Sequence, residues 1–451
     1  MSRKISLIMI AALIAALFCG CKSTNPEIDA GPTDGVTNPA EPGKDEVIDY
    51  AASIKLDMSS DTAKQEVTVK TYVDGDTTHF HVPANVNDTG VLKARYIAIN
   101  TPESTGKIEE YGKKASNFTR EKLSSAVSII IESDESTWNL DSTGGRNLVW
   151  VWYKTSDAED YRNLNVEILQ NGLAIASSSA NNRYGETCMA AIAQAKAQKL
   201  NIYSGQKDPD FYYGEAVELT LKELRMNVEA YTGVKVAFTG VITMNNNNGV
   251  YIEDYDEETG MYYGISVYYG FGLPGEGLDV LTVGNESRIV GTVQYYEAGG
   301  TYQVAGLTYR QMKPDDPNNI QKISSGHEPS YTLTDAETFI SKKTLTTEEG
   351  EATFDYAALA LGTSLEMKNL KVKNIYTTNN EDSSSFGAMT LECEADGITI
   401  TVRTVPLLAE DGSLITEEAY RGKTIDVKGI VDYFDGAYQI KVFSEDNIII
   451  Q

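Results

Sequence analysis

The pattern of apolar and polar residues predicts a chain built mostly from short β-strands. Between residues 62 and 206, several runs alternate apolar and polar positions, as strands with one buried face do. The strands predicted there are Val67–Tyr72, Thr77–His81, Leu92–Ile99, Val127–Ile131 and Leu148–Tyr153. The first two are joined by Asp74-Gly75-Asp76, a sequence that favours a tight turn.

Three further segments of the same region have the spacing of amphipathic helices. They are Glu110–Ala126, Leu164–Asn171 and Glu186–Leu200, and Gly172 is placed to end the second. Five strands with helices between them are typical of an OB-type barrel, a small closed β-barrel.

The chain from about residue 215 onward is rich in predicted strands and contains a weak internal repeat. Gly291–Val304 reads GTVQYYEAGGTYQV and Gly429–Ile440 reads GIVDYFDGAYQI. Each has two alternating runs around a glycine turn, which predicts a β-hairpin. We therefore expect two related β-barrel domains, at residues 215–312 and 331–451, with residues 313–330 as a linker.

The first 21 residues have the features of a targeting segment. Arg3 and Lys4 precede the apolar run Ile5–Phe18, which is too short to span a bilayer comfortably and is typical of a signal peptide. The run ends in a pattern that resembles a bacterial lipoprotein signal, with Gly20 before a lipidated Cys21. The resemblance implies a lipid anchor in the cell envelope, on the outer membrane or cell surface, facing the periplasm or the exterior. The alternative is secretion of a soluble product.

The segment after Cys21 has little to bury. Residues 22–47 are dominated by proline, glycine, small polar and acidic residues, which predicts a flexible tether. We include residues 48–61 in the tether, so that the first folded domain is predicted to begin at residue 62.

Composition limits the kind of surface that this chain presents. A length of 451 residues suggests about three domains. The net charge of −27 excludes a broad basic face, so any binding of phosphate must be local. Beyond residue 21 the cysteines are Cys188 and Cys393, which are too few for a disulfide framework. Cys188 shares a predicted helix face with Ala191, Ile192 and Ala195, as a buried structural thiol does.

Four sequence segments in the first domain resemble one known family. They are VKTYVDGDTTHF, LKARYIAINTPES, EEYGKKASNFTREKL and TGGRNLVWVWY, in this order between Val69 and Tyr153. Together they resemble the staphylococcal nuclease (thermonuclease) family over residues 62–206. The resemblance implies a five-stranded barrel that holds a calcium ion, a carboxylate base and two arginines around a phosphodiester. The two later domains look like OB-fold modules appended to secreted nucleases, so the predicted fold class is mainly β with some α.

The resemblance implies a calcium site made of oxygen ligands. Asp76 and the carbonyl of Thr101 would be direct ligands, and Asn100 stands where the family usually has an aspartate. An amide oxygen still coordinates a hard cation, but the site loses one negative charge, so we expect weaker calcium affinity. On its own, Asp-Gly-Asp is also an ordinary hairpin turn.

Three residues are predicted to perform the chemistry. The resemblance makes Glu103 the general base and gives Arg95 and Arg146 the role of binding phosphate oxygens and stabilising the charge that develops there. The loop before Arg146 departs from the family, because Gly144 replaces a tyrosine and Thr143 a lysine. The aspartate often found ahead of both is Ser142, with Asp141 one residue earlier.

The substrate-binding residues are less well defined. Where the family often has tyrosines for phosphate and base contact, this chain has Ser177-Ser178-Ser179. Arg183 and Tyr184 are candidates to replace them. Tyr153 is a candidate to line the pocket, with packing in the core as the alternative.

The leading hypothesis is a membrane-tethered, calcium-dependent nuclease that hydrolyses DNA or RNA. The alternative is a nuclease-like barrel that has lost activity and binds nucleic acid or protein. A third reading makes the C-terminal domains the main functional part, with nucleic acid or another surface component as their partner.

Overall fold

The computed structural model describes residues 47–451, except residues 298, 314, 348–349 and 382. The predicted signal peptide, Cys21 and most of the predicted tether therefore lie outside the described residues. Residues Ile48–Gln451 form one compact unit. Within the described residues, no helix is both long and apolar enough to cross a membrane.

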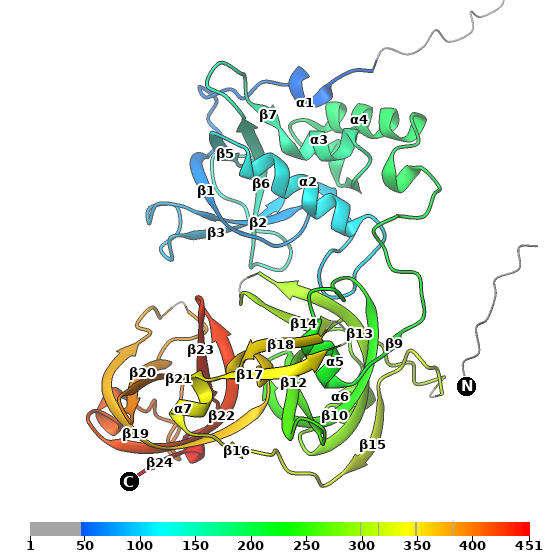
Figure 1. The fold of residues 1–451 in the computed structure, drawn as a ribbon. Helices are drawn as coiled ribbons and strands as arrows, with labels where there is room; N and C mark the ends of the chain where they lie inside the picture. The colour runs from blue at the N-terminus through cyan, green and yellow to red at the C-terminus, as the bar shows by residue number, and fades with distance from the viewer. Residues whose placement is uncertain (1–46, 298, 314, 348–349, 382) are drawn as a thin grey trace, which may run out of the picture. The chain divides into compact units, whose positions relative to one another are not determined.

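The first domain is a closed five-stranded barrel (Figure 1). Its strands run in the order β3-β2-β1-β5-β6, and a parallel pairing of β3 with β6 closes the ring. The strands are β1 Lys64–Tyr72, β2 Thr77–His81, β3 Val91–Tyr96, β5 Ser128–Glu132 and β6 Asn147–Lys154, with the short β7 Arg162–Asn163 at the edge. Their inward side chains form one core with Trp150 and Trp152, which are fully buried.

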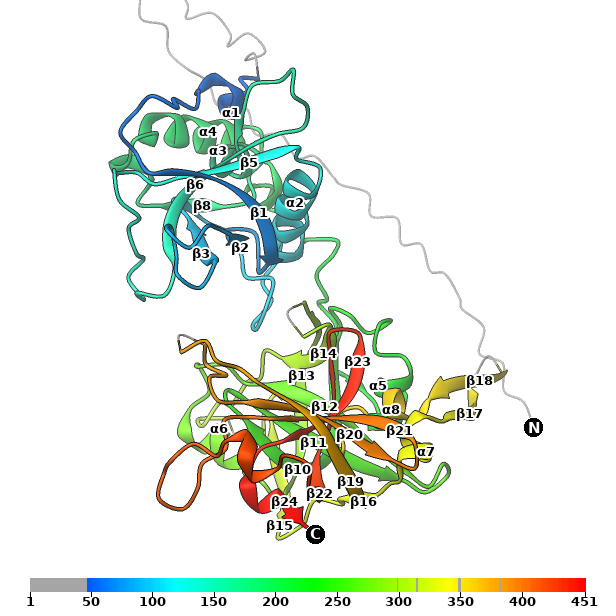
Figure 2. The ribbon, with the colours of Figure 1, turned by 90° about the vertical axis from the view of Figure 1, so that its left-hand side faces the viewer.

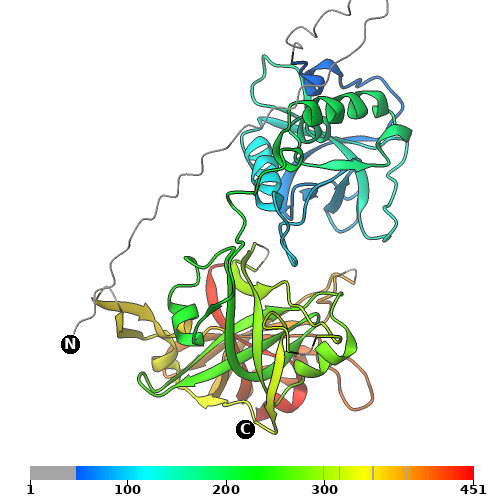
Figure 3. The ribbon, with the colours of Figure 1, turned by 90° about the vertical axis from the view of Figure 1, so that its right-hand side faces the viewer.

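Helices cover one side of this barrel. They are α1 Tyr50–Ser53, α2 Gly112–Ser124, α3 Leu164–Gln170 and α4 Gly185–Ala197. Helices α3 and α4 lie side by side (Figures 2 and 3). Cys188 faces into the packed side of α4 and is fully buried, and burial raises the pKa of its thiol to about 12.

The N-terminal boundary of this domain differs from the prediction. Residues 48–61 were assigned to the tether, but α1 packs on α3 and its Ala51 is fully buried. The backbone N–H of Ala51 donates to Gln170, and Arg162 forms a two-point ion pair with Asp49. The packed part of the domain therefore begins near Ile48, because these polar contacts anchor a segment that has few apolar residues.

The strand predicted at Leu92–Ile99 is broken in the structure. The backbone turns at Ile97, and Ala98 adopts a left-handed conformation with φ of 73°. The chain then continues as β4 Ala98–Asn100, which pairs with β8 Ile175–Ser177 in a separate small sheet. The break matters for function because it brings Asn100 out of the barrel wall.

The second domain repeats the same barrel order. Strands β10, β11, β12, β14 and β13 close a ring through the pairing of β13 with β10, and β12 pairs with β14 in parallel. The strands are β9 Val217–Glu218, β10 Lys235–Asn246, β11 Gly249–Asp256, β12 Met261–Tyr268, β13 Asn285–Tyr296, β14 Thr301–Ala305 and β15 Gln321–Ser325, with helices α5 Leu221–Met226 and α6 Gly275–Val280. Residues 313–330 are not only a linker, because β15 pairs with β13.

The third domain has the same topology again. Its ring is β19-β20-β21-β23-β22, closed by β19 with β22, and β21 and β23 are parallel. The elements are β16 Thr332–Leu333, α7 Ala336–Ile340, β17 Lys342–Thr347, β18 Gly350–Asp355, α8 Tyr356–Leu359, β19 Ser364–Thr377, β20 Met389–Ala395, β21 Ile398–Thr404, β22 Thr424–Phe434, β23 Ala437–Val442 and β24 Ile448–Ile450. Three barrels with one strand order confirm the predicted fold class, and both repeat hairpins are present as β13–β14 and β22–β23.

The boundary between the last two domains is a packed one. Leu345 and Leu359 precede the third ring, yet they belong to the core of the second barrel. Glu253 of β11 is buried and accepts hydrogen bonds from Ser330 and Ser364.

Candidate active site

The turn between β1 and β2 carries two buried carboxylates. The side chain of Asp74 accepts a hydrogen bond from the backbone N–H of Asp76 at 3.0 Å, which fixes the turn. Thr119 of α2 donates to the carbonyl of Gly75 at 2.6 Å. A Cβ atom at Gly75 would lie 2.8 Å from Thr101, so only glycine fits between the turn and that segment.

Four of the predicted site residues are in direct contact. The carboxylate of Asp76 accepts a hydrogen bond from the backbone N–H of Thr101 at 2.8 Å and forms an ion pair with Arg95. The same guanidinium donates to the amide oxygen of Asn100 at 2.5 Å. Asp76 and Thr101 are almost fully buried, whereas Arg95 retains some exposure. The Arg95 side chain therefore bridges two of the residues predicted to bind calcium.

The break between β3 and β4 produces this arrangement. Arg95 and Asn100 are only five residues apart, yet Arg95 lies in the barrel and Asn100 in the small sheet with β8. The hydroxyl of Ser179 donates to the carbonyl of Ala98 at the break and is itself buried. Ser179, the last residue of the Ser177-Ser178-Ser179 segment, therefore stabilises the backbone at this break.

Glu103 lies in a loop that returns on itself. Its backbone N–H donates to the carboxylate of Glu109 at 3.1 Å, and its carbonyl accepts from the backbone N–H of Glu109 at 2.9 Å. A Cβ atom at Gly112 would overlap the Glu103 carbonyl at 2.1 Å, so glycine lets α2 begin against this loop. Burial and the nearby Asp76 raise the pKa of Glu103, and Arg95 partly opposes that shift.

Arg146 is held by an aspartate on its own loop. Its Nε donates to Asp141 Oδ2 at 2.7 Å, and Asp141 Oδ1 accepts from the backbone and side chain of Thr143. Burial opposes ionisation of Asp141, but the hydrogen bonds from Thr143 and Arg146 outweigh it and lower the pKa of Asp141. Asp141, which lies one residue before the position where the resemblance implies an aspartate, therefore pairs with Arg146.

Asp74 was named in the sequence only as part of a turn, and the structure adds it to the site. Burial, followed by repulsion from Asp76, raises the pKa of Asp74 to about 7. Asp74 is thus a second buried carboxyl group beside Asp76, and its raised pKa reduces the negative charge that it carries near neutral pH. The signal for it in the sequence is the spacing Asp-Gly-Asp, which places both carboxylates on one tight turn.

The donor chemistry of these residues fits calcium, while their arrangement is not a preformed cage. Calcium takes carboxylate, amide and backbone carbonyl oxygens, all of which are present at Asp76, Asn100 and Thr101. Among the residues that the structure describes, no three His, Cys, Asp or Glu side chains are arranged to hold a metal ion. Because Arg95 contacts both Asp76 and Asn100, a cation that used those oxygens would have to share or displace its guanidinium.

Two of the three proposed substrate-binding residues have structural roles instead. Tyr153 is 2% exposed and donates its hydroxyl to Glu167 within the core, so core packing is its role. Tyr184 packs edge-on against Trp150 with ring centroids 5.0 Å apart, and its hydroxyl donates to buried Glu132. Arg183 is exposed and its guanidinium lies 5.9 Å from the Tyr184 ring centroid. Aromatic residues with polar tips at the ends of strands and helices suit either role, and only their packing decides between them.

The fold and the grouped residues define the first domain as a nuclease-like OB barrel. Residues 93–205 match the family model described as staphylococcal nuclease homologue. Over 149 residues the chain is 29% identical to the thermonuclease of Staphylococcus intermedius, an alignment that covers 32% of this chain and 80% of that protein. The chain therefore contains a staphylococcal nuclease-like domain, as the sequence motifs indicated.

Proposed function

We propose that this protein is a membrane-anchored, secreted, calcium-dependent nuclease that hydrolyses phosphodiester bonds of DNA or RNA. The observation that carries the proposal is the grouping of Asp76, Arg95, Asn100 and Thr101 by hydrogen bonds, with Glu103 near enough to Asp76, Arg95 and Arg146 for electrostatic interaction. The similarity to a thermonuclease supports the same activity.

The residues divide the work between phosphate binding and proton transfer. Arg95 and Arg146 would bind the non-bridging oxygens of the scissile phosphate and stabilise the charge that grows on them. Glu103 would accept the proton of the attacking water as the general base. A calcium ion held by Asp76, Asn100 and Thr101 would supply further positive charge at the phosphate.

The proposal is tested by cleavage of single-stranded and duplex DNA, and of RNA, by the protein lacking residues 1–47. We expect cleavage with calcium, none with a chelator, and a loss of about 100-fold or more in the Glu103→Gln variant. Glu121→Gln is the matched control, because Glu121 is an exposed residue of α2. No cleavage by a folded protein at saturating calcium would contradict the proposal and favour the alternative, a binding module.

A binding module is favoured by one specific observation. Arg95 hydrogen-bonds the side chains of Asp76 and Asn100, which are the oxygens that calcium would need. Asn100 is uncharged, so it does not add to the attraction for a cation that would have to displace Arg95. In that case nucleic acid would bind to the Glu103→Gln variant and to the unchanged protein with equal affinity, and neither would cleave it.

Two parts of the proposal concern the rest of the chain. Lipidation of Cys21 would anchor the protein in the cell envelope, and Cys21→Ser should release it into the soluble fraction. The two C-terminal barrels would bind nucleic acid or another surface component. Binding assays on residues 215–451 test this directly and separate it from the nuclease activity.

A further inference from the structure

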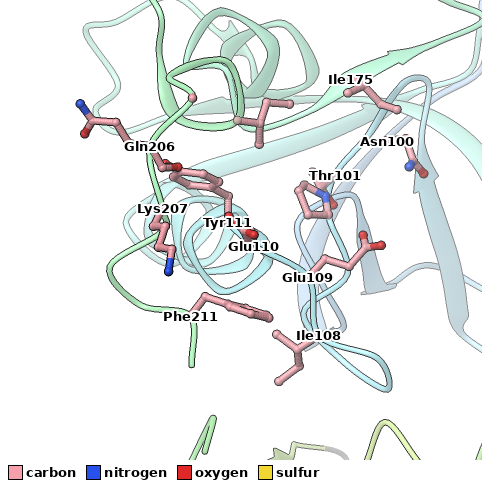
Figure 4. Close-up of a pocket in the computed structure, with 13 residues that line it drawn as sticks. Asn100, Thr101, Ile108, Glu109, Glu110, Tyr111, Ile175, Gln206, Lys207 and Phe211 are labelled. Carbon is pink, nitrogen blue, oxygen red and sulfur yellow. The ribbon is translucent and has the colours of Figure 1, made fainter. Parts of the chain in front are cut away.

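A cavity of about 730 Å³ adjoins the candidate active site (Figure 4). Asn100, Thr101 and Pro102 form one wall, so the cavity and the predicted calcium ligands share the same segment of chain. The opposite wall comes from Lys207 and Phe211, which lie beyond the part of the chain that matches the nuclease family model. The second wall was not anticipated from the motifs.

The segment that supplies the second wall is fixed to the nuclease-like domain. Asp208 is 2% exposed, and its carboxylate accepts a hydrogen bond from the backbone N–H of Tyr111 at 2.6 Å. The hydroxyl of Tyr111 donates in turn to the carbonyl of Gln206 at 3.1 Å. The backbone N–H of Asp208 donates to the Tyr213 hydroxyl at 2.9 Å. Two of these hydrogen bonds join Tyr111, at the start of α2, to residues 206–213, and the third is within that segment. The second wall is therefore part of the folded domain.

The Phe211 ring is held in a defined orientation. It packs edge-on against Tyr213 with centroids 4.9 Å apart and an interplanar angle of 68°. Lys207 covers the Tyr213 ring, with its ammonium 4.5 Å from the centroid. Figure 4 shows the Phe211 ring extending from the chain after Lys207 toward Ile108. A flat aromatic group that enters the cavity would therefore meet a preoriented ring.

The charges around the cavity decide which part of a substrate it suits. Glu109 and Glu110 contribute two carboxylates to its lining and Lys207 contributes one ammonium, which lies over the Tyr213 ring, so the lining carries a net negative charge that disfavours a phosphate. In Figure 4 the carboxylate of Glu109 points toward Asn100. Apolar side chains, Ile108, Ile175 and Phe211, complete the lining. Carboxylates accept hydrogen bonds from amino and imino groups, and a nucleobase combines such groups with an apolar face.

We propose that this cavity binds the base of the nucleotide directly next to the scissile phosphate, with Phe211 as its stacking partner. The inference rests on the proposed function, since it places the phosphate at Arg95 and Glu103. Asn100 lines the cavity and also contacts Arg95, which would bind the phosphate, so one nucleotide spans the two. The nucleotide on the other side of the scissile phosphate would extend away from the cavity.

Three dinucleotides with one phosphodiester each test the assignment. One carries both bases, and in each of the others one base is replaced by an abasic residue. For the unchanged protein, residues 48–451, loss of the base in the cavity should lower kcat/KM by about 5- to 150-fold, as loss of one base–aromatic stack does. Phe211→Ala should lower kcat/KM by a similar factor for substrates that keep this base. It should leave the substrate without it unchanged.

Two further variants keep the test decisive. Phe211→Trp should retain the base dependence, because a larger ring still stacks. Phe271→Ala is the matched control, since Phe271 is 90% exposed in the second barrel. Circular dichroism and thermal unfolding establish that each variant is folded.

The outcomes separate this inference from the proposed function. If the unchanged protein cleaves DNA but Phe211→Ala affects all three dinucleotides equally, or none, the base site is wrong and the nuclease stands. If the folded, unchanged protein cleaves neither DNA nor dinucleotides, the proposed function fails and the base site fails with it.

Discussion

The guanidinium of Arg95 donates a hydrogen bond of 2.5 Å to the amide oxygen of Asn100. The same group is paired with Asp76, so an arginine predicted to bind phosphate contacts two residues predicted to bind calcium. A cation bound as proposed would therefore compete with the arginine for the same oxygens. Binding of a cation would release Arg95 toward the phosphate, which links the two halves of the site.

Asn100→Asp should raise the calcium affinity of the protein. The substitution adds a carboxylate to the ligand set, and calcium affinity increases with the charge of its ligands. The stronger pairing of Arg95 with the new carboxylate opposes part of the gain, so we expect a dissociation constant about tenfold lower. Isothermal titration calorimetry measures it without reference to activity.

The control for this variant is Asn87→Asp in the same domain. It changes the net charge equally, and the Asn87 side-chain oxygen accepts from Thr89 in a way that a carboxylate also can. Equal effects of the two variants on calcium binding would show that general electrostatics, and not a ligand at Asn100, is responsible.

Asp141 should act through Arg146. Removing its charge in Asp141→Asn weakens the 2.7 Å ion pair that orients the guanidinium, so we expect kcat to fall by about 3- to 10-fold. In an Arg146→Ala background the same substitution should have no further effect, because nothing remains to be oriented. Additive losses in the double variant would show that Asp141 has a separate role.

Much of the fold follows from local patterns in the sequence. Strand alternation, the glycine turns of β13–β14 and β22–β23, and the end of α3 at Gly172 all depend on a few neighbouring residues. The break at Ala98 does not, because the alternation in LKARYIAIN continues through it. Its left-handed backbone is stabilised by Ser179, about 80 residues later in the chain.

Part of the candidate site was predictable from the resemblance of short motifs to a known family. Asp76, Arg95, Asn100 and Thr101 were recognised from motifs, and the structure brings them together. Residues whose role depends on long-range packing were not. Tyr184 was placed at the substrate because its packing against Trp150 leaves no mark in the sequence, and the second wall of the cavity depends on the contact of Asp208 with Tyr111.

Acid should weaken the attachment of α1 to the first domain. Arg162 hydrogen-bonds the carboxylate of Asp49 and lowers its pKa below the ordinary 3.8. A carboxylate with a lowered pKa in the folded state stabilises that state above its unfolded pKa, and the contribution is lost as pH falls through the folded value. Asp49→Asn should remove the contribution at pH 7, where we expect a loss of about 1 kcal/mol or less because Asp49 is partly exposed.

Amide hydrogen exchange of residues 50–56 measures this local opening. Exchange, corrected for its intrinsic dependence on pH, should be faster in Asp49→Asn than in the unchanged protein at pH 7, and the difference should become smaller as the pH falls below 3.8. Asp61→Asn, an exposed residue of the same segment, is the matched control. A difference that persists unchanged at pH 3 would mean that the charge of Asp49 does not hold α1.

Glu253 should couple the two C-terminal barrels. Its carboxylate is 2% exposed and accepts from the backbone N–H of Ser330 at 2.8 Å and of Ser364 at 2.6 Å. Glu253→Ala leaves the buried N–H of Ser364 without this acceptor, so we expect a loss of about 2–4 kcal/mol in unfolding free energy. Glu257 is exposed in the turn that follows β11 and serves as the control. Glu257→Ala should change the free energy of unfolding by about 0.5 kcal/mol or less.

The positions of the tryptophans allow the unfolding of the first domain to be followed separately. All three tryptophans, Trp138, Trp150 and Trp152, lie in the nuclease-like domain. Tryptophan fluorescence therefore follows the unfolding of that domain, while calorimetry follows all three barrels. Glu253→Ala should lower the calorimetric transition of the C-terminal barrels and leave the fluorescence transition where it is. A fluorescence midpoint that falls with the calorimetric one would show that the three barrels unfold together and that Glu253 stabilises them all.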